Sequence, residues 1–519
     1  MTGAELTENG QVTEAFDPGE ARPQPRLKFI NRRQLLLRQI DVEQLVAEDH
    51  PVRAIWELVG RMDLEPYYQS IGAVEGVAGR EPFDPQLLIS LWIYAYSQKV
   101  SSAREVARRC DYDPAYQWLT GLEAINYHTL SDFRVQHQEA LNGLFTQVLG
   151  VLSQAGWITL ERVMHDGTKV KANAADNSFR RQATLEKHLE RARQRIQEMG
   201  DPHSEELSQR VAQARQRACR EKQQRVEAAL QQLTAIQASK SSPSAQAQAR
   251  ASLTDPDARI MCQAKSGFAP SYNLQISTDA QASLIVGVGV SQAANDEAEL
   301  EPALERIAAH LEKVPQQMVV DEGFINQPSV VALDQRQIDL IGPVPDSSAR
   351  SQAGLKHRGV SPEFFPSAFV YEVASSSYRC PAGKTLAYEG REKKGLTTRY
   401  RYRARPSDCQ ACPFKSQCCP KSRKGRSIVR SEEAPAVAAF KVKMQTPQAR
   451  EIYKQRAGIA EFPNAWIKEK IGLRQFRLRG LAKVTLEALW VCLTYNIQQW
   501  IRLVWRPQVP LAPNWAARS

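Results

Sequence analysis

The sequence predicts an α/β protein with helical parts on either side of its core and a further helical insertion within it. Three observations support this. Residues 30–155 show apolar residues at helical spacing, residues 158–174 and 271–342 alternate strand and helix patterns, and residues 180–238 carry a heptad seam. The chain has 519 residues, so we expect three or four structural units.

The N-terminal part divides into a tail over residues 1–25, predicted to be disordered, and a helical domain over 26–155. Asp84-Pro85 predicts a helix start, Ser102 and Glu105 predict a capping box, and Thr129 predicts the cap of a helix through Leu149. The short basic helices suit a helix-turn-helix that reads DNA. A helical dimerisation bundle explains them equally well.

Two predicted strands each end in an aspartate. Residues 156–179 form the first part of the core, with a strand ending at Asp166, and residues 253–368 form the second part, with a strand ending at Asp321. Strand ends are where open α/β sheets place active sites. Paired carboxylates repel each other, so a cation is their natural partner, and oxygen ligands suit Mg²⁺ or Mn²⁺. Two such ions can activate an attacking water and stabilise the leaving oxygen of a phosphodiester.

Within the second part we expect a hairpin, two helices and two strands. They are Tyr272–Thr278 paired with Ser283–Val290, then Glu297–Leu311, Gln317–Val320, Pro328–Gln337 and Asp339–Val344. The insertion over 180–238 is predicted to fold back as a helical hairpin, broken near Gly200–Pro202, and residues 239–252 are predicted to be a flexible linker.

Positive charge gathers near the C-terminal end. The chain carries 68 Lys and Arg against 57 Asp and Glu, and residues 441–483 alone hold eleven basic and three acidic residues. This surface suits a phosphate backbone, although a solvated basic helix face would look the same.

Within this basic segment, Glu461 is a candidate third acid. Pro463 predicts that Glu461 lies at a helix entry, with Lys468 on the same face two turns later. Residues 431–505 form the final part of the core, and 506–519 a C-terminal tail.

Residues 369–430 are a cysteine-rich insert. Cys409-x-x-Cys412, Cys418 and Cys380 match the donors of a structural zinc site, with Cys419 as an alternative to Cys418. Reduced thiols in a loop-rich subdomain are the other interpretation.

Several motifs together resemble the insertion-sequence DDE transposases of bacteria. Tyr453-x-x-Arg456, Glu461 and Lys468 resemble the Tyr-Arg-Glu-Lys motif of this family. Asp166-Gly-Thr-Lys169 and Val320-Asp321-Glu-Gly-Phe324 resemble its two aspartate motifs, and Phe83-Asp-Pro85, Ser101–Arg104 and His128–Arg134 resemble its N-terminal domain.

The resemblance implies a ribonuclease-H-like catalytic core that cuts and joins DNA by transesterification. It implies that Asp166, Asp321 and Glu461 hold two Mg²⁺ or Mn²⁺ ions, with Glu451 and Glu469 as alternatives for the glutamate. It also implies that Tyr453, Arg456 and Lys468 contact DNA, and we expect Arg474 and Arg477 of the basic segment to do the same. A homodimer is expected, because two element ends must be brought together.

Two other functions remain open. A ribonuclease-H-like nuclease or resolvase would share the core, and a non-catalytic DNA-binding regulator would share the basic surface. No window reads as a membrane span and no secretion signal is visible, so we expect a cytoplasmic protein without a membrane partner.

Overall fold

The computed structural model describes residues 33–508 apart from 34, 36, 38, 74–80, 199–208, 264–266, 346, 395 and 396. The predicted tail over 1–25, the helix break at 200–202 and most of the tail over 506–519 lie outside the described residues.

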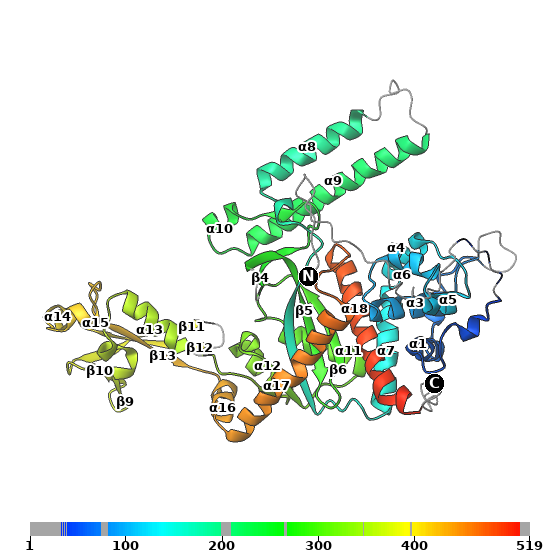
Figure 1. Cartoon of the computed structure of the whole chain (residues 1–519). Helices are drawn as coiled ribbons and strands as arrows, with labels where there is room; N and C mark the ends of the chain where they lie inside the picture. Colours follow the sequence, from blue (N-terminus) through cyan, green and yellow to red (C-terminus); the bar gives the residue numbers. More distant parts are fainter. Residues whose placement is uncertain are drawn as a thin grey trace, which may run out of the picture.

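A six-stranded mixed sheet forms the centre of the molecule (Figure 1). Along it the strands follow the order β4-β5-β1-β7-β8, and β6 also pairs with β5. Strands β5 and β6 are antiparallel, as are β1 and β5, whereas β1, β7 and β8 run parallel. The bounds are β1 Arg162–Lys171, β4 Arg259–Gln263, β5 Gly267–Asp279, β6 Leu284–Ser291, β7 Gln317–Val319 and β8 Asp339–Ile341. The hairpin predicted within residues 271–290 is confirmed by β5 and β6.

Strand β1 corrects one prediction from the sequence. Asp166 lies in the middle of β1 and does not end it. The reason is that β5 pairs with β1 without interruption from Val163 to Lys171, so the ladder carries the strand past Gly167.

Successive residues of the parallel strands point to two different cores. Met164, Val319 and Ile341 pack with Ala449 and Ala460 of helix α17 (Pro447–Trp466). Their neighbours face the other side and join the main core, which contains helices α11 (Leu300–Leu311) and α18 (Leu481–Trp500); these neighbours are Val163, Met318 and Leu340. The sheet is therefore covered by helices on both faces.

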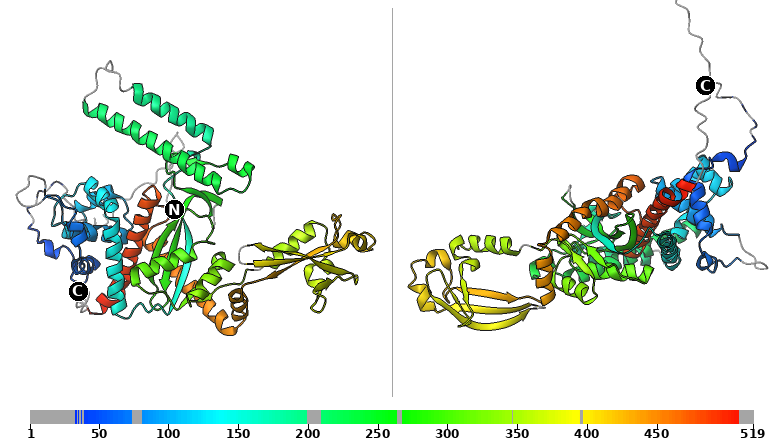
Figure 2. Two further views of the ribbon diagram at one scale, coloured as in Figure 1. Left: turned by 180° about the vertical axis from the view of Figure 1, so that it is seen from behind. Right: turned by 90° about the horizontal axis from the view of Figure 1, so that it is seen from below.

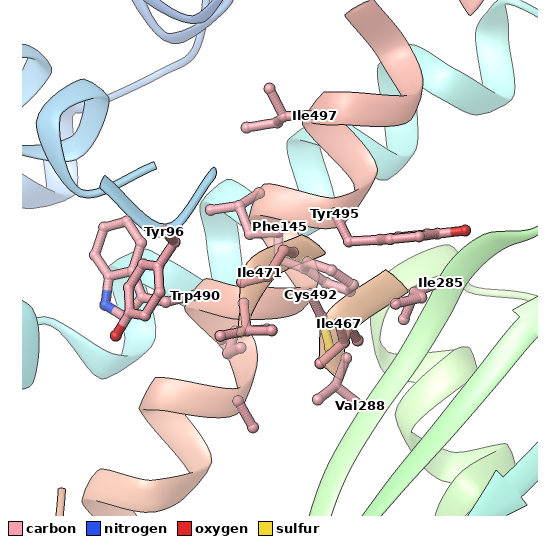
Figure 3. Close-up of a cluster of buried hydrophobic side chains, with 14 of the residues drawn as sticks. Tyr96, Phe145, Ile285, Val288, Ile467, Ile471, Trp490, Cys492, Tyr495 and Ile497 are labelled. Carbon is pink, nitrogen blue, oxygen red and sulfur yellow. The ribbon is translucent and has the colours of Figure 1, made fainter. Parts of the chain in front are cut away.

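Helix α18 joins the sheet to the N-terminal helices (Figure 3). Its Trp490 and Tyr495 are fully buried beside Tyr96 and Phe145 of the helical domain and Ile285 of β6. Neither α18 nor any other described helix is long and apolar enough to cross a membrane.

The N-terminal region contains the helices α1 Pro51–Gly60, α2 Glu65–Tyr68, α3 Pro85–Ser97, α4 Ala103–Cys110, α5 Pro114–Thr120, α6 Tyr127–Gln136 and α7 Gln138–Gln154. Asp84 caps α3 as predicted. The capping box at Ser102 was wrong, since Ser102 makes no side-chain cap bond and Glu105 pairs with Arg108 and Arg109. Thr129 is not a cap either, because Asn126 already caps α6 from Tyr127.

The insertion forms two long helices that lie side by side and project from the core, α8 (Gln182–Glu198) and α9 (Gln209–Ala238) (Figure 1). Leu185 of α8 packs against Ala229 and Leu233 of α9. The predicted linker over 239–252 was wrong. It contains helix α10 (Pro243–Ala247) and strand β3 (Ala251–Ser252), which pairs with β2 (Phe179–Arg180) at the base of the hairpin.

The cysteine-rich insert builds a second sheet, which lies beyond helix α16 (Pro435–Lys443) and away from the central sheet (Figure 2). Five antiparallel strands follow the order β13-β12-β11-β10-β9. They are β9 Val370–Glu372, β10 Ser377–Arg379, β11 Thr385–Lys394, β12 Thr397–Ala404 and β13 Ser427–Glu432. The sequence predicted a small subdomain here but not its sheet. In β12 arginine and tyrosine alternate, and the strand has no Val or Ile, so no apolar strand pattern was recognised.

Candidate active site

Asp166 and Asp321 lie close to the point where the pairing of the parallel strands β1 and β7 ends. The register pairs Arg162 with Gln317 and ends with Met164 paired with Val319. Asp166 and Asp321 each lie two residues beyond this last pair. The charge of Asp321 contributes to the raised pKa of Asp166, so the two aspartates predicted from separate motifs lie near each other.

Helix α17 supplies polar partners to Asp166. Arg456 Nη2 donates to Oδ1 at 2.9 Å, and Asn464 Nδ2 donates to Oδ2 at 3.1 Å. Only 22% of the Asp166 side chain is exposed. Burial raises the pKa of Asp166, the Arg456 charge opposes this, and the charges of Asp321 and Asp296 add to it. The Asp166 carboxylate thus lies among polar partners, with the positive charge of Arg456 beside it.

Further hydrogen bonds connect helix α17 and the turn after it with the residues near Asp166 and Asp321. Tyr453 donates its hydroxyl to Asp321 Oδ1 at 3.2 Å, and Lys468, in the turn after α17, donates to Thr168 of β1. Burial lowers the pKa of Lys468, while the Asp166 charge opposes that shift. Three of the predicted DNA contacts, Tyr453, Arg456 and Lys468, are therefore gathered around the two aspartates.

Glu461 is placed differently from the prediction. Helix α17 begins at Pro447, so Glu461 lies in the body of the helix and Pro463 lies inside it, where the sequence placed both at a helix entry. The Glu461 side chain is exposed and makes no hydrogen bond or ion pair with any described residue. Along the helix it lies between Arg456 and Asn464, which both touch Asp166.

The two alternative glutamates are already paired. Glu451 binds Lys454 at 3.0 Å, and Glu469 binds Arg474. Both pairs are exposed. Among the three glutamates, Glu461 alone has no partner among the described residues.

Several polar residues of this site were not found from the sequence. Asn464 touches Asp166, and Asp296 accepts hydrogen bonds from Asn273 and Gln275 at 2.7 and 2.8 Å. No local signal marks them, because each becomes part of the site through contacts with residues far away in the chain.

His165 has a structural role. It is fully buried, and its two ring nitrogens bond to Ser277 and Gln275, each at 2.9 Å. Burial lowers the pKa of His165 to about 3, so the ring is neutral.

Gly167 has a steric reason to be a glycine. A Cβ there would lie 2.6 Å from both Asp296 Oδ1 and Gln275 Nε2. We expect Gly167→Ala to lower the free energy of unfolding by about 1–3 kcal/mol, because these buried groups must move. Chemical denaturation measures this. Gly143→Ala is the matched control, because Gly143 lies at an exposed position of helix α7 and a Cβ there meets nothing within 4 Å; its stability should rise by about 0.5–1 kcal/mol. Equal behaviour of the two variants would contradict the steric argument.

Further basic residues lie beside the end of β1, beyond the two aspartates. Gln475 forms a bridge with Lys171 at the end of the strand, so the segment with Arg474 and Arg477 lies beside it. Both arginine side chains are exposed, and only that of Arg474 is paired, with Glu469.

The donor atoms at this edge suit a hard cation. Besides the two aspartates, the side-chain oxygens Asn273 Oδ1 and Asn464 Oδ1 are buried and receive no hydrogen bond. Nevertheless, no three His, Cys, Asp or Glu side chains among the described residues are arranged to hold a metal ion. Arg456 and Asn464 bind the two oxygens of Asp166 that a cation would use.

The cysteines of the second sheet also lie together. Cys380, Cys409, Cys412, Cys418 and Cys419 all line one cavity of about 20 Å³. Cys380 Sγ accepts the Lys384 N–H at 3.2 Å, and Cys409 Sγ accepts the Arg426 N–H at 3.4 Å. Burial raises the pKa of Cys418 to about 12, so without a cation it is a neutral thiol.

Comparison with known proteins gives two family matches. Residues 40–136 match the family described as transposase domain (DUF772), which spans helices α1 to α6. Residues 379–501 match the transposase DDE domain, which includes Glu461 but neither Asp166 nor Asp321. No curated protein matches the sequence.

Among solved structures, a piggyBac transposase synaptic complex with hairpin DNA is aligned over 89% of this chain and 82% of that chain, at 10% identity and a TM-score of 0.24. A score this low carries no structural argument. The two family matches are independent of it and lie on separate parts of the sequence. These two matches, over residues 40–136 and 379–501, indicate an insertion-sequence DDE transposase, as the motifs predicted.

Proposed function

We propose that this transposase binds the ends of its insertion sequence and cleaves and transfers DNA strands at the edge formed by β1 and β7. The observation that carries the proposal is that Asp166 and Asp321 each lie two residues beyond the last pair of the β1–β7 register, Met164 with Val319. The strand order supports it too. Strands β6, β5 and β1 are antiparallel neighbours followed by the parallel β7 and β8, which is the strand order that we expect of a ribonuclease-H-like core.

Divalent ions such as Mg²⁺ or Mn²⁺, when bound at the aspartates, supply charge neutralisation and an activated nucleophile. The chain itself positions the DNA. Arg456 and Lys468 carry cationic groups beside Asp166 and Thr168, and a phosphate arriving there gains charge-assisted hydrogen bonds from both. Tyr453 adds a hydroxyl donor next to Asp321. These residues hold the scissile phosphate against the acidic pair.

Glu461 completes the acidic set in this proposal. Asn464 lies three positions after Glu461, which corresponds to about 60° around the helix. Because its side chain has no partner among the described residues, a change of rotamer costs no existing contact. The glutamate can therefore turn toward Asp166 when a cation is present.

The DNA path continues over Lys171, Arg474 and Arg477 beside the end of β1. Two element ends must meet for strand transfer, so a homodimer is part of the proposal. The protein acts in the cytoplasm, where chromosomal DNA is reached without crossing a membrane.

The test uses a supercoiled plasmid that carries both ends of the element from its own genomic locus, with Mg²⁺ or Mn²⁺. We expect 3′ nicks at both ends and strand transfer to a target. Scattered nicking without joining would favour a ribonuclease-H-like nuclease or resolvase. End binding without nicking by the wild type would favour a non-catalytic regulator.

For the cysteine-rich sheet we propose a structural zinc ion held by Cys380, Cys409, Cys412 and Cys418, with Cys419 as the alternative fourth ligand. The support is that all five line one cavity and that two of the sulfurs already accept backbone N–H groups, which favours thiolates. The thiols must move closer together to bind an ion, since no three of the described cysteines are arranged for it.

Zinc content gives a direct prediction. We expect about one zinc per chain in the purified protein by elemental analysis, and a loss of most of it in Cys409→Ser, because a four-thiolate site loses affinity steeply with one ligand. Cys262→Ser is the matched control, as Cys262 is exposed on β4 in the other sheet. A wild-type protein without zinc would show that the thiols are simply reduced.

A further inference from the structure

The cysteine-rich sheet has one covered face and one open face. Leu386, Tyr402 and Ile428 of β11, β12 and β13 point to the covered face, where they share a core with Leu355 of helix α13 (Ser347–His357). The alternate residues of the same three strands point the opposite way, and most of them are exposed. The open face is therefore available to a partner.

A row of arginines lies along β12 on the open face. Arg399, Arg401 and Arg403 occupy alternate positions of this strand. Two residues of a strand span about 6.7 Å, which is comparable with the separation of successive phosphates along one DNA strand. Arg403 pairs with Glu389 at 2.7 Å. Arg399 and Arg401 are exposed and form no hydrogen bond or ion pair with any described residue.

The residues next to these two arginines on the neighbouring strands do not neutralise them. Arg401 lies between Gly390 of β11 and Val429 of β13. Pairs of opposite charge across strands stabilise a sheet, and Arg401 has no such neighbour. Glu392 lies opposite Arg399, but these two described side chains form no ion pair. The positive charge of the row is thus free to bind an anion.

A hollow of about 220 Å³ lies at the same place on the open face. Its lining contains three arginines and two glutamates, which are Arg391, Arg399, Arg401, Glu389 and Glu392. Because Arg403 already binds Glu389, the hollow keeps a net positive charge. A concave site with several guanidinium groups suits a phosphate, which a guanidinium binds through two parallel hydrogen bonds.

The row of arginines begins close to the catalytic core. Thr397, at the start of β12, donates its hydroxyl to Gln327, the first residue of helix α12 (Gln327–Gln335). Gln327 follows Asp321 by six residues. This end of β12 is therefore held near the strand end that carries Asp321, and the arginines lead away from it.

We propose that the open face is a second DNA-binding surface, on which Arg399 and Arg401 bind successive phosphates of one strand of a DNA duplex. The inference rests on the proposed function, because the duplex is the one held for cleavage near Asp166 and Asp321. The contacts are to the backbone, so they position the duplex without reading its sequence.

The test is the salt dependence of DNA binding by the full-length protein. The probes are a duplex with one element end and its flanking DNA, and an unrelated duplex of equal length. Arg399→Gln combined with Arg401→Gln should weaken binding to both duplexes by the same factor. The slope of log affinity against log salt should become shallower by about 1.8, since each lost phosphate contact removes about 0.9. Both side chains are exposed and without a described partner, so the fold should be kept.

The matched control is Lys356→Gln combined with Arg358→Gln. It removes the same charge from exposed residues of α13 and the turn after it, on the covered side of the same sheet. Its slope should equal that of the wild type. An unchanged slope in the arginine variant, or an equal change in the control, would overturn the inference.

A second measurement needs no variant. Phenylglyoxal modifies accessible arginines, and mass spectrometry locates the products. We expect the end duplex to protect Arg399 and Arg401 while Arg358 stays reactive; equal modification with and without DNA would overturn the inference. Failure of the proposed function is distinguishable. Protection in a protein that does not nick element ends contradicts only the catalytic proposal, whereas nicking with both arginines unprotected contradicts only this surface.

Discussion

Replacing Asp166 by asparagine is expected to lower the rate of strand cleavage by at least about 10³-fold, the size of loss seen when a preorganised electrostatic group is removed from an active site. The variant should still fold. Its amide oxygen can accept from Arg456, and Asn464 can turn its amide so that the unpaired Oδ1 accepts from the new NH₂ group. The change therefore removes one charge and little packing.

The measurement is the rate of 3′ nicking at the element ends, with DNA affinity determined in parallel. Affinity should stay within about twofold, because the phosphate-binding side chains are untouched. Asp176→Asn makes the same chemical change at an exposed aspartate in the segment after β1 and should keep the wild-type rate. Equal loss of cleavage and binding in Asp166→Asn would argue against a catalytic role for this residue.

The largest effect on stability is expected at Glu487 of helix α18. This carboxylate is fully buried and accepts the backbone N–H groups of Arg477 and Leu478 at 2.9 Å. Glu487→Ala leaves both N–H groups without an acceptor and removes a buried charge near Arg134. We expect the free energy of unfolding to fall by about 3–5 kcal/mol. Because Arg477 belongs to the basic segment beside β1, DNA binding should weaken as well.

Denaturant titration measures this loss of stability. Glu305→Ala, on the exposed side of α11, is the control, and its free energy of unfolding should stay within about 0.5 kcal/mol of the wild type.

The pH dependence of stability gives a second check. Burial raises the pKa of Glu487, so the folded protein holds this proton more tightly than the unfolded chain. This contribution to stability is greatest below the unfolded pKa of about 4.3 and declines as pH rises through the folded pKa. Glu487→Gln should lack this decline; an identical pH profile in the two proteins would refute the assignment.

Local patterns in the sequence were sufficient to locate the two aspartate motifs. Strand alternation and the hairpin are encoded within a few residues, so the strands near these motifs could be predicted, although β1 continues past Asp166 to Lys171. Tyr453, Arg456 and Lys468 were pointed out by the resemblance to the transposase motif, and the structure places them near the two aspartates.

Other predictions failed where tertiary packing overrides local signals. Pro463 indicated a helix start, yet α17 packs on the sheet through Ala449 and Ala460, and this burial holds the helix together across the proline. The linker over 239–252 looked flexible by composition, but β3 gains a partner strand at the base of the hairpin.

The sequence by itself indicated the family, the two aspartate motifs and the basic segment near the C-terminal end. Only the tertiary structure decided which further groups meet the pair. Asn464 reaches Asp166 across 298 residues of sequence, and Asp296 reaches the backbone of β1 because a glycine leaves room for it. Such contacts depend on how separate elements pack, and packing is set by the whole core and not by any local pattern.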